Sequence, residues 1–159
     1  MEQLRFLTQD QVRRLQAEFG TPLFVYDQTS LERQAAIALG FPAPFGITVR
    51  YAMKACPSAA VLRVLTGAGL HIDASSGWEV RRAIAAGVAA DRILLTAQQI
   101  PEDLAELIEL GARFNACSLA QLAAFGAACP GRELSVRLNP GLGSGHSNRT
   151  NVGGPSASF

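Results

Sequence analysis

Three ionisable residues stand where chemistry could take place, at or near the carboxyl ends of predicted strands. Lys54 ends an alternating segment, residues 49–54, whereas Asp73 and Arg137 lie inside the otherwise apolar stretches HIDAS and SVRLN. Burial of an unpaired charge is costly, so we expect Asp73 and Arg137 to face each other, Lys54 or a bound ligand. An amine, an anion and a cation at one surface suit an anionic aldehyde, with which a lysine can form a Schiff base. A solvent-exposed lysine with no chemical role is the alternative.

Other polar residues at the predicted strand ends have structural explanations. Two pairs have the spacing of helix-capping boxes, Ser76 with Glu79 and Ser118 with Gln121. A lone histidine such as His71, deeper on the strand face of Asp73, is typical of a core residue with satisfied hydrogen bonds. Cys117 is interpreted as a small buried apolar residue, because no histidine lies near it in the sequence to activate a thiol.

The chain before residue 47 predicts two helices separated by a short strand. Capping boxes mark the start of each helix, Thr8 with Gln11 and Thr29 with Glu32. The first helix is expected over residues 8–19 and ends at Gly20. Residues 22–26, PLFVY, predict a strand, and residues 40–46, GFPAPFG, predict a loop.

From residue 47 the chain repeats a unit of roughly 20 residues, the size of one helix and one strand with short loops. Each helical stretch ends in a glycine, and the four are Gly69, Gly87, Gly111 and Gly131. Pro101 before Glu102 predicts the start of one of these helices. Five strands alternating with four helices predict a parallel sheet, in either a (β/α)8 barrel or a doubly wound fold. The absence of G-x-G-x-x-G after any strand disfavours a dinucleotide-binding version.

Composition limits the classes of function. Hydrophobic residues make up 48% of the 159 residues and charged residues 17%, which is typical of a globular protein with one core. A net charge of +1 without a basic run makes nucleic acid or an anionic membrane an unexpected partner. The three cysteines, Cys56, Cys117 and Cys129, lack metal-ligand spacing, and the amino-terminal stretch lacks an apolar signal-peptide core. We therefore expect a cytoplasmic protein without a bound metal.

Several collinear motifs resemble one family of enzymes. They are YAMKACP at residues 51–57, HIDASSGWEVRRAIAAGV at 71–88, ILLTAQQ at 93–99, RLNPG at 137–141 and GGPSASF at 153–159. In this order they resemble the pyridoxal-phosphate-dependent decarboxylases of the alanine-racemase-like barrel fold, which include diaminopimelate, ornithine and arginine decarboxylases. RLNPG and the loop GSGHSNRTNVGG resemble the diaminopimelate branch, whose reaction yields lysine.

The resemblance implies roles for particular residues. Lys54 would be the catalytic lysine that forms a Schiff base with pyridoxal 5'-phosphate, and Asp73 and Arg137 would bind the cofactor with it. Glu79 would complete the family's acidic pair with Asp73. The cofactor ring would act as the electron sink when CO2 is lost. Cys56 departs from the family's usual asparagine, and Ser158 stands where a basic residue is common.

The resemblance also implies that the chain is part of a larger enzyme. A barrel needs about 200 residues or more, so we expect only the first five strands of a (β/α)8 pyridoxal-phosphate barrel here. Residues 1–46 would hold the leading helices and strand, 47–141 five strand–helix units, and 142–159 a glycine-rich loop with His146 and Arg149 near the site. The full-length enzyme would be a homodimer acting on a small amino acid, and this chain alone would be inactive. A non-catalytic homologue, or another barrel enzyme such as an ornithine or arginine decarboxylase or a racemase-like relative, is the alternative.

Overall fold

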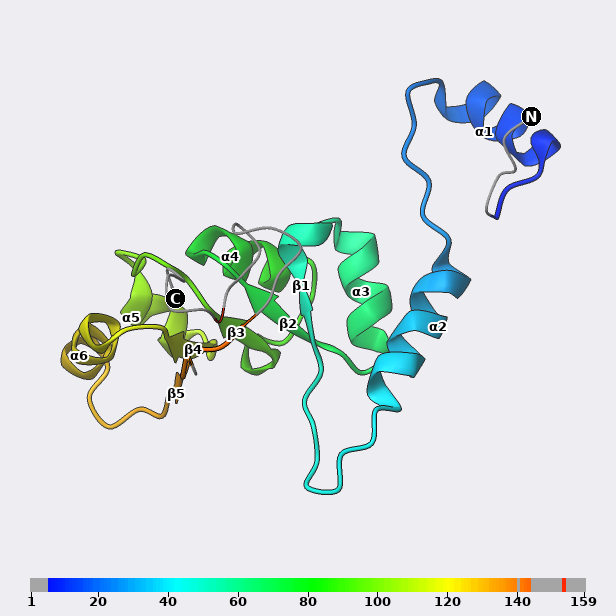
Figure 1. Ribbon diagram of the computed structural model, residues 1–159. Coiled ribbons are helices and arrows are strands. Elements are labelled where there is room, and N and C mark those ends of the chain that lie inside the picture. The colour runs from blue at the N-terminus through cyan, green and yellow to red at the C-terminus, as the bar shows by residue number, and fades with distance from the viewer. Residues whose placement is uncertain (1–5, 140, 144–152, 154–159) are drawn as a thin grey trace.

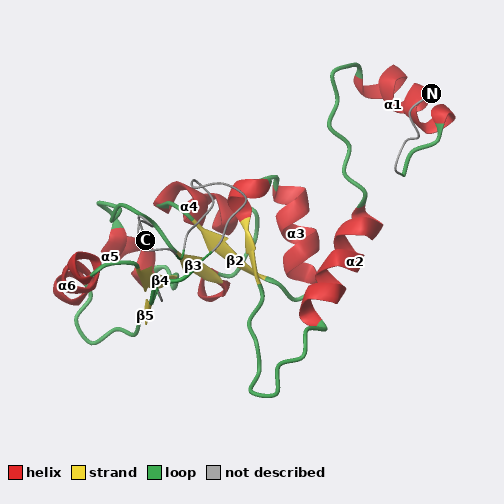
Figure 2. Cartoon of the chain, viewed as in Figure 1, coloured by secondary structure: helices red, strands yellow, loops and turns green. Residues whose placement is uncertain are grey.

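The protein is an α/β structure built on a parallel sheet (Figures 1 and 2). The computed structural model describes residues 6–139, 141–143 and 153. The strands are β1 (Arg50–Ala52), β2 (His71–Ala74), β3 (Ile93–Leu95), β4 (Arg113–Ala116) and β5 (Ser135–Val136). The α-helices are α1 (Gln9–Phe19), α2 (Gln28–Leu39), α3 (Ala59–Gly67), α4 (Gly77–Ala85), α5 (Leu104–Glu109) and α6 (Leu119–Ala128). Two short 3-10 helices, η1 (Met53–Ala55) and η2 (Ala90–Arg92), complete the described elements.

The strand order distinguishes between the two sheet architectures that the sequence allows. The order is β1-β2-β3-β4-β5, and every neighbouring pair is parallel. Because crossovers between parallel strands are right-handed, a sheet that always advances in one direction carries its crossover helices on one face. A doubly wound sheet reverses its direction instead. The prediction of a barrel-type sheet with five strands is therefore confirmed.

The two faces of the sheet differ in polarity. Along β2, Ile72 and Ala74 are fully buried, whereas His71 and Asp73, which alternate with them, are only half-buried. The buried face packs under the crossover helices in one hydrophobic core, whose largest members include Met53, Leu62, Ile72, Leu95, Phe114 and Phe125. The opposite face carries ionisable side chains, because strand residues alternate between faces.

Glycines end the repeated helices as the sequence predicts. Gly69, Gly87, Gly111 and Gly131 have φ angles of 114°, 93°, 105° and 76°. Residues with a Cβ rarely adopt this region, so glycine lets each helix stop and the chain turn into the next strand. This repeated ending explains how short loops return the chain to the end of the sheet where all the strands begin.

The first helix is also confirmed, and it lies apart from the sheet. Thr8 and Gln11 form the expected capping box, in which the Gln11 amide donates to Thr8 Oγ1 at 3.2 Å and the Thr8 amide donates to Gln11 Oε1 at 2.7 Å. Figure 1 shows α1 joined to α2 through an extended segment. None of the residues of α1 is buried, so this helix adds nothing to the core.

Three sequence predictions in this part of the chain need correction. Residues 22–26 are not a strand, because no described strand pairs with them, and Phe24 is 87% exposed. Helix α2 starts before the predicted Thr29, since the Asp27 side chain accepts a hydrogen bond from the Ser30 amide at 2.9 Å and caps the helix. Glu32 accepts from the Gln28 side chain instead, at 2.7 Å.

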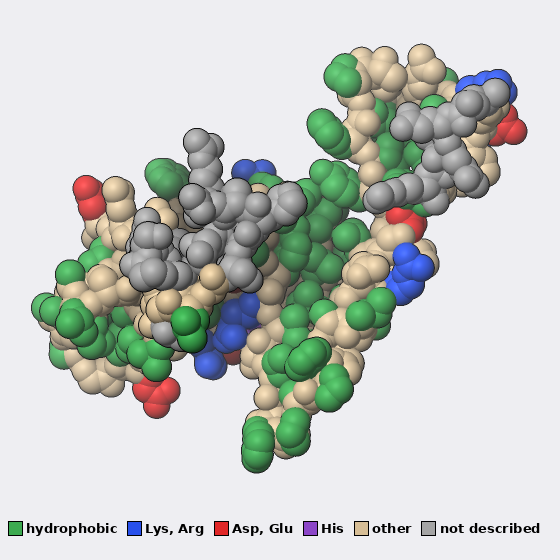
Figure 3. Space-filling view, in the orientation of Figure 1, with side chains coloured by type: hydrophobic (Ala, Val, Ile, Leu, Met, Phe, Trp, Pro, Cys, Tyr) green, Lys and Arg blue, Asp and Glu red, His purple; other side chains and the backbone are tan. Residues whose placement is uncertain are grey.

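Two boundaries in the repeated part also differ from prediction. Strand β1 ends at Ala52, so Lys54 lies in the 3-10 turn η1 and not in the strand, because Met53 turns into the core at 0% exposure. Helix α5 starts at Leu104, after the predicted Pro101–Glu102, and its N-cap Asp103 makes no side-chain capping bond. The predicted loop at 40–46 is observed, and Figure 3 shows hydrophobic side chains gathered there. Phe41 and Phe45 of this loop are exposed.

The described helices are all too short or too polar to cross a lipid bilayer.

The stack between β4 and α6 provides a test of the core. The Phe114 and Phe125 rings are parallel, with centroids 5.5 Å apart, and both side chains are buried. We expect Phe125→Ala to lower the free energy of unfolding by about 3–5 kcal/mol, because it removes the stack and leaves a cavity. The matched control Phe45→Ala, at a fully exposed phenylalanine, should change it by less than about 0.5 kcal/mol. Urea denaturation measures both, and equal effects would contradict this packing.

Candidate active site

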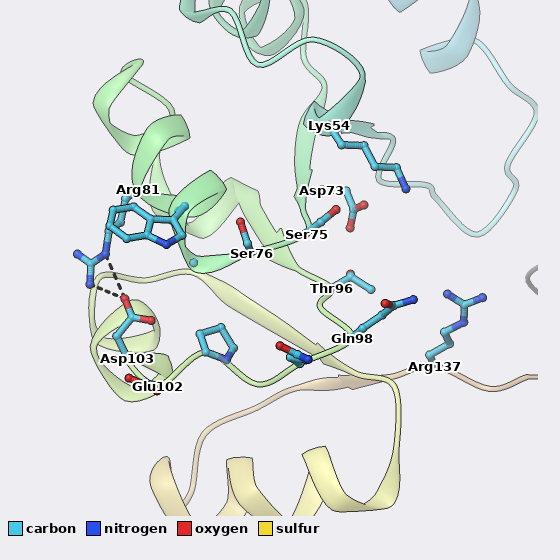
Figure 4. Close-up of a pocket in the computed structure, with 14 residues that line it drawn as sticks. Lys54, Asp73, Ser75, Ser76, Arg81, Thr96, Gln98, Glu102, Asp103 and Arg137 are labelled. Carbon is cyan, nitrogen blue, oxygen red and sulfur yellow. Dashed lines mark hydrogen bonds and ion pairs between the residues drawn. The ribbon is translucent and has the colours of Figure 1, made fainter. Parts of the chain in front are cut away.

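A cavity of about 1090 Å³ lies at the carboxyl end of the sheet. Turns and loops after successive strands line it, as expected where parallel strands end together. Figure 4 shows how its side chains converge. The lining residues from the strand ends include Lys54 after β1, Asp73 in β2, Ser75 and Ser76 after β2, Thr96, Gln98 and Gln99 after β3, and Arg137 after β5.

The cavity brings together the three residues that the sequence singles out. Lys54 is exposed, and its side chain extends from η1 over the cavity on the side of Asp73 (Figure 4). The strand register explains this proximity, because Ala52 pairs with Asp73 and Lys54 follows within one turn. Arg137 follows β5, at the opposite edge of the described sheet from β1, and points into the same cavity (Figure 4). An amine, a carboxylate and a guanidinium therefore line one space.

The electrostatic environment of Asp73 reflects its position between core and cavity. Burial raises the pKa of this carboxyl, and the Thr96 side chain and the positive charges of Lys54 and Arg50 partly offset the increase. A half-buried carboxylate is poorly solvated, so it gains from a cation held nearby. Asp73 therefore favours a protonated amine or another cation at the Lys54 end of the cavity.

The loop after β2 is fixed by the capping residues that the sequence predicts. The Glu79 amide donates to Ser76 Oγ at 3.2 Å, and Glu79 Oε2 accepts from the Ser75 amide at 2.6 Å. Ser76 is thus a helix cap, as expected. The Glu79 carboxylate bonds to backbone and is not among the residues that line the cavity. It is close enough to Asp73 for its negative charge to add to the rise in the pKa of that carboxyl.

His71 departs from its sequence interpretation, whereas Cys117 agrees with its own. His71 is not the satisfied core residue that the sequence predicts, because its buried Nδ1 atom has no hydrogen-bond partner among the described residues. Burial and the nearby Arg92, Arg50 and Arg113 lower its pKa, so this imidazole tends to be neutral. Burial raises the pKa of the Cys117 thiol, which agrees with its interpretation as a residue that is not a nucleophile.

Sequence reasoning missed the outer wall of the cavity. Arg81 donates to Asp103 Oδ2 from Nη2 at 2.7 Å and from Nε at 3.1 Å, and to Glu106 Oε2 at 2.8 Å. These bonds join α4 to the start of α5 beside the exposed Trp78 (84%). The partners are more than 20 residues apart, so no local spacing reveals them. His146, Arg149 and Ser158 of the predicted glycine-rich loop lie outside the described residues.

Comparison with known proteins places this site in a family. Residues 29–159 match the model of the "pyridoxal-dependent decarboxylase, pyridoxal binding domain". The chain belongs to this family. The match covers every strand and all the residues at the carboxyl end of the sheet. The predicted pyridoxal cofactor is thus confirmed at the level of the family.

Individual relatives give the same result. Diaminopimelate decarboxylase of Escherichia coli is 39% identical over 153 residues, covering 93% of this chain and 35% of that protein. The Streptomyces coelicolor enzyme of the same name is 39% identical over 143 residues, covering 87% of this chain and 31% of that one. A crystal structure of diaminopimelate decarboxylase superposes with a TM-score of 0.81 at 37% identity, covering 96% of this chain and 36% of that chain. The chain spans about a third of the length of the curated relatives it matches.

A further solved structure extends the likeness beyond one branch of the family. The lysine/ornithine decarboxylase of Vibrio vulnificus complexed with putrescine superposes with a TM-score of 0.69 at 28% identity, covering 83% of this chain and 37% of that one. Its lower identity and TM-score mean that this chain is more similar to the diaminopimelate decarboxylases described above.

The raised pKa of Asp73 predicts a pH-dependent stability. The folded protein binds this proton more tightly than the unfolded chain, so the stability that protonation provides is lost as pH rises from 3.8 through the raised folded-state pKa. We expect Asp73→Asn to be more stable than the parent at about pH 7, with an advantage that shrinks towards about pH 4. Urea denaturation across this range measures the difference. The control Glu18→Gln, exposed on α1, should show no such trend, and a destabilising Asp73→Asn would contradict the burial argument.

Proposed function

We propose that the full-length protein is a pyridoxal-phosphate-dependent decarboxylase that converts meso-diaminopimelate to lysine and CO2. The observation that carries this proposal is the convergence of Lys54, Asp73 and Arg137 on one cavity within a pyridoxal-binding domain. The identity of about 39% to two diaminopimelate decarboxylases supports this substrate. The resemblance further leads us to propose a cytoplasmic homodimer as the assembled enzyme.

The residues in the cavity fit the pyridoxal group. The Lys54 amine is exposed in a space of about 1090 Å³, where it would hold the cofactor's aldehyde covalently. Asp73 and Arg137 would hold its polar groups. When bound, the cofactor's ring withdraws electrons from the bond that releases CO2.

The chain's own residues prepare the site through charge and position. Asp73 attracts the Lys54 ammonium and so favours a side chain that stays over the cavity. Arg137 presents a planar guanidinium, which suits paired hydrogen bonds to a carboxylate or phosphate. The Ser76 and Glu79 bonds keep the loop beyond Asp73 in one conformation, so that the carboxylate keeps its place beneath the amine.

The attachment site for the cofactor is open to a direct test, because Lys54 is the only lysine among residues 1–159. We expect the full-length protein to bind pyridoxal phosphate with a yellow absorbance, and borohydride reduction followed by peptide mapping to find the adduct on Lys54. Lys54→Ala should abolish both signals. Lys54→Arg is the matched control, since it keeps the positive charge beside Asp73 but cannot attach the aldehyde. An adduct at another residue would refute the assignment.

Substrate preference and the contribution of the rest of the protein are tested by CO2 release. We expect the full-length protein to release CO2 from meso-diaminopimelate faster than from ornithine, arginine or lysine. Residues 1–159 expressed alone should release none and should self-associate, because β1 and β5 are open edges of the described sheet. A full-length protein that binds the cofactor without releasing CO2 would favour the non-catalytic alternative. A stable, active monomer of residues 1–159 would contradict the second expectation.

A further inference from the structure

We propose that Gln121 is a positioning residue for the candidate active site, where it fixes the wall that follows β3. This inference rests on the proposed function for its meaning in catalysis, but its structural part stands on the hydrogen bonds alone. Gln121 does not line the cavity. It acts through the loops that do.

The burial of Gln121 is unusual within the described residues. It is 4% exposed, and among the described residues it is the one polar or charged side chain that is buried. A buried amide is tolerated where its donors and acceptor are paired, and leaving either one unpaired is costly. A buried glutamine at this position therefore depends on hydrogen-bond partners for both its carbonyl oxygen and its NH2 group.

Both ends of the Gln121 side chain are paired, and they bond to two different loops. Its Oε1 accepts from the Cys117 amide at 2.7 Å, after β4. Its Nε2 donates to the carbonyl oxygens of Ala97 at 2.8 Å and Gln98 at 3.0 Å, after β3. The side chain thus ties the loop of one strand to the loop of its neighbour.

The preceding repeat shows why glutamine differs from glutamate here. Glu79 occupies the same position in α4 that Gln121 occupies in α6, three residues after a serine cap. Glu79 also accepts from the amide just before its cap, that of Ser75 at 2.6 Å. A carboxylate cannot donate, however, so only the amide of Gln121 can also hold the carbonyls of the neighbouring loop.

The two tethered loops meet at the Arg137 end of the cavity. Gln98 lines the cavity and extends into it on the side of Arg137 (Figure 4). The Arg137 amide donates to the carbonyl of Ala116 at 2.8 Å, directly before Cys117. Gln121 therefore sets the distance between Gln98 and Arg137, and with it the shape of the space that receives an anionic group.

The test replaces the amide with a carboxyl of the same shape. In the full-length protein, Gln121→Glu can donate to the Ala97 and Gln98 carbonyls only when protonated, and its pKa should be raised by those two oxygens. We expect pyridoxal phosphate affinity to fall by about tenfold at about pH 8 and to recover towards the parent value at about pH 5.5. The KM for the amino acid should rise at the higher pH and return towards the parent value at the lower pH. Gln16→Glu, exposed on α1, is the matched control and should show no change.

Hydrogen exchange at the Cys117 amide supplies a readout that does not require activity. It should be slow in the parent and in Gln121→Glu at either pH, because a carboxylate still accepts from this amide. Gln121→Leu should lose this protection, after correction for intrinsic exchange. A variant with a lower melting temperature but parental cofactor affinity and KM at every pH would overturn the proposal. Failure of the borohydride adduct at Lys54, with the Cys117 protection still dependent on Gln121, would refute the proposed function and leave the loop tether intact.

Discussion

The separation of apolar and polar side chains onto the two faces of the sheet governs the rest of this structure. Alternation along each short strand places residues such as Ile72 and Phe114 under the helices at 0% exposure. The same alternation forces their neighbours, such as His71 and Asp73, onto the other face. Burial of the apolar face stabilises the fold, and its geometric consequence is a second face rich in charge.

That second face is where the chemistry can take place. Asp73 is held in a poorly solvating environment that raises its pKa, with Lys54 as a nearby cation. Deeper on the same face, burial and the nearby Arg92, Arg50 and Arg113 lower the pKa of His71. Arg50 Nε is buried there without a hydrogen-bond partner among the described residues.

The loops at the carboxyl end need more than the core to hold their shape. The same arrangement recurs at the start of α4 and of α6. A serine caps the helix, and the side-chain oxygen of Glu79 or Gln121 accepts from the backbone amide of the residue just before that serine. These bonds begin the helix and fix the end of the strand at the same time. Further out, Arg81 joins α4 to the start of α5. The site is thus positioned by bonds within each loop and by bonds between neighbouring repeats.

The sequence alone determined the repeat, the parallel sheet, the glycine helix ends and the candidate residues Lys54, Asp73 and Arg137. Each depends on local information, namely hydrophobic period, cap spacing, a residue that permits positive φ, or a charge inside an apolar strand. Only the tertiary structure decided that the strands advance in one direction, and that residues 22–26 do not pair. It also placed Lys54 in a turn after β1, where Met53 enters the core. The bonds of Arg81 with Asp103 and of Gln121 with Ala97 join residues 22 and 24 positions apart. Such contacts leave no local pattern, because they exist only once neighbouring repeats have packed side by side.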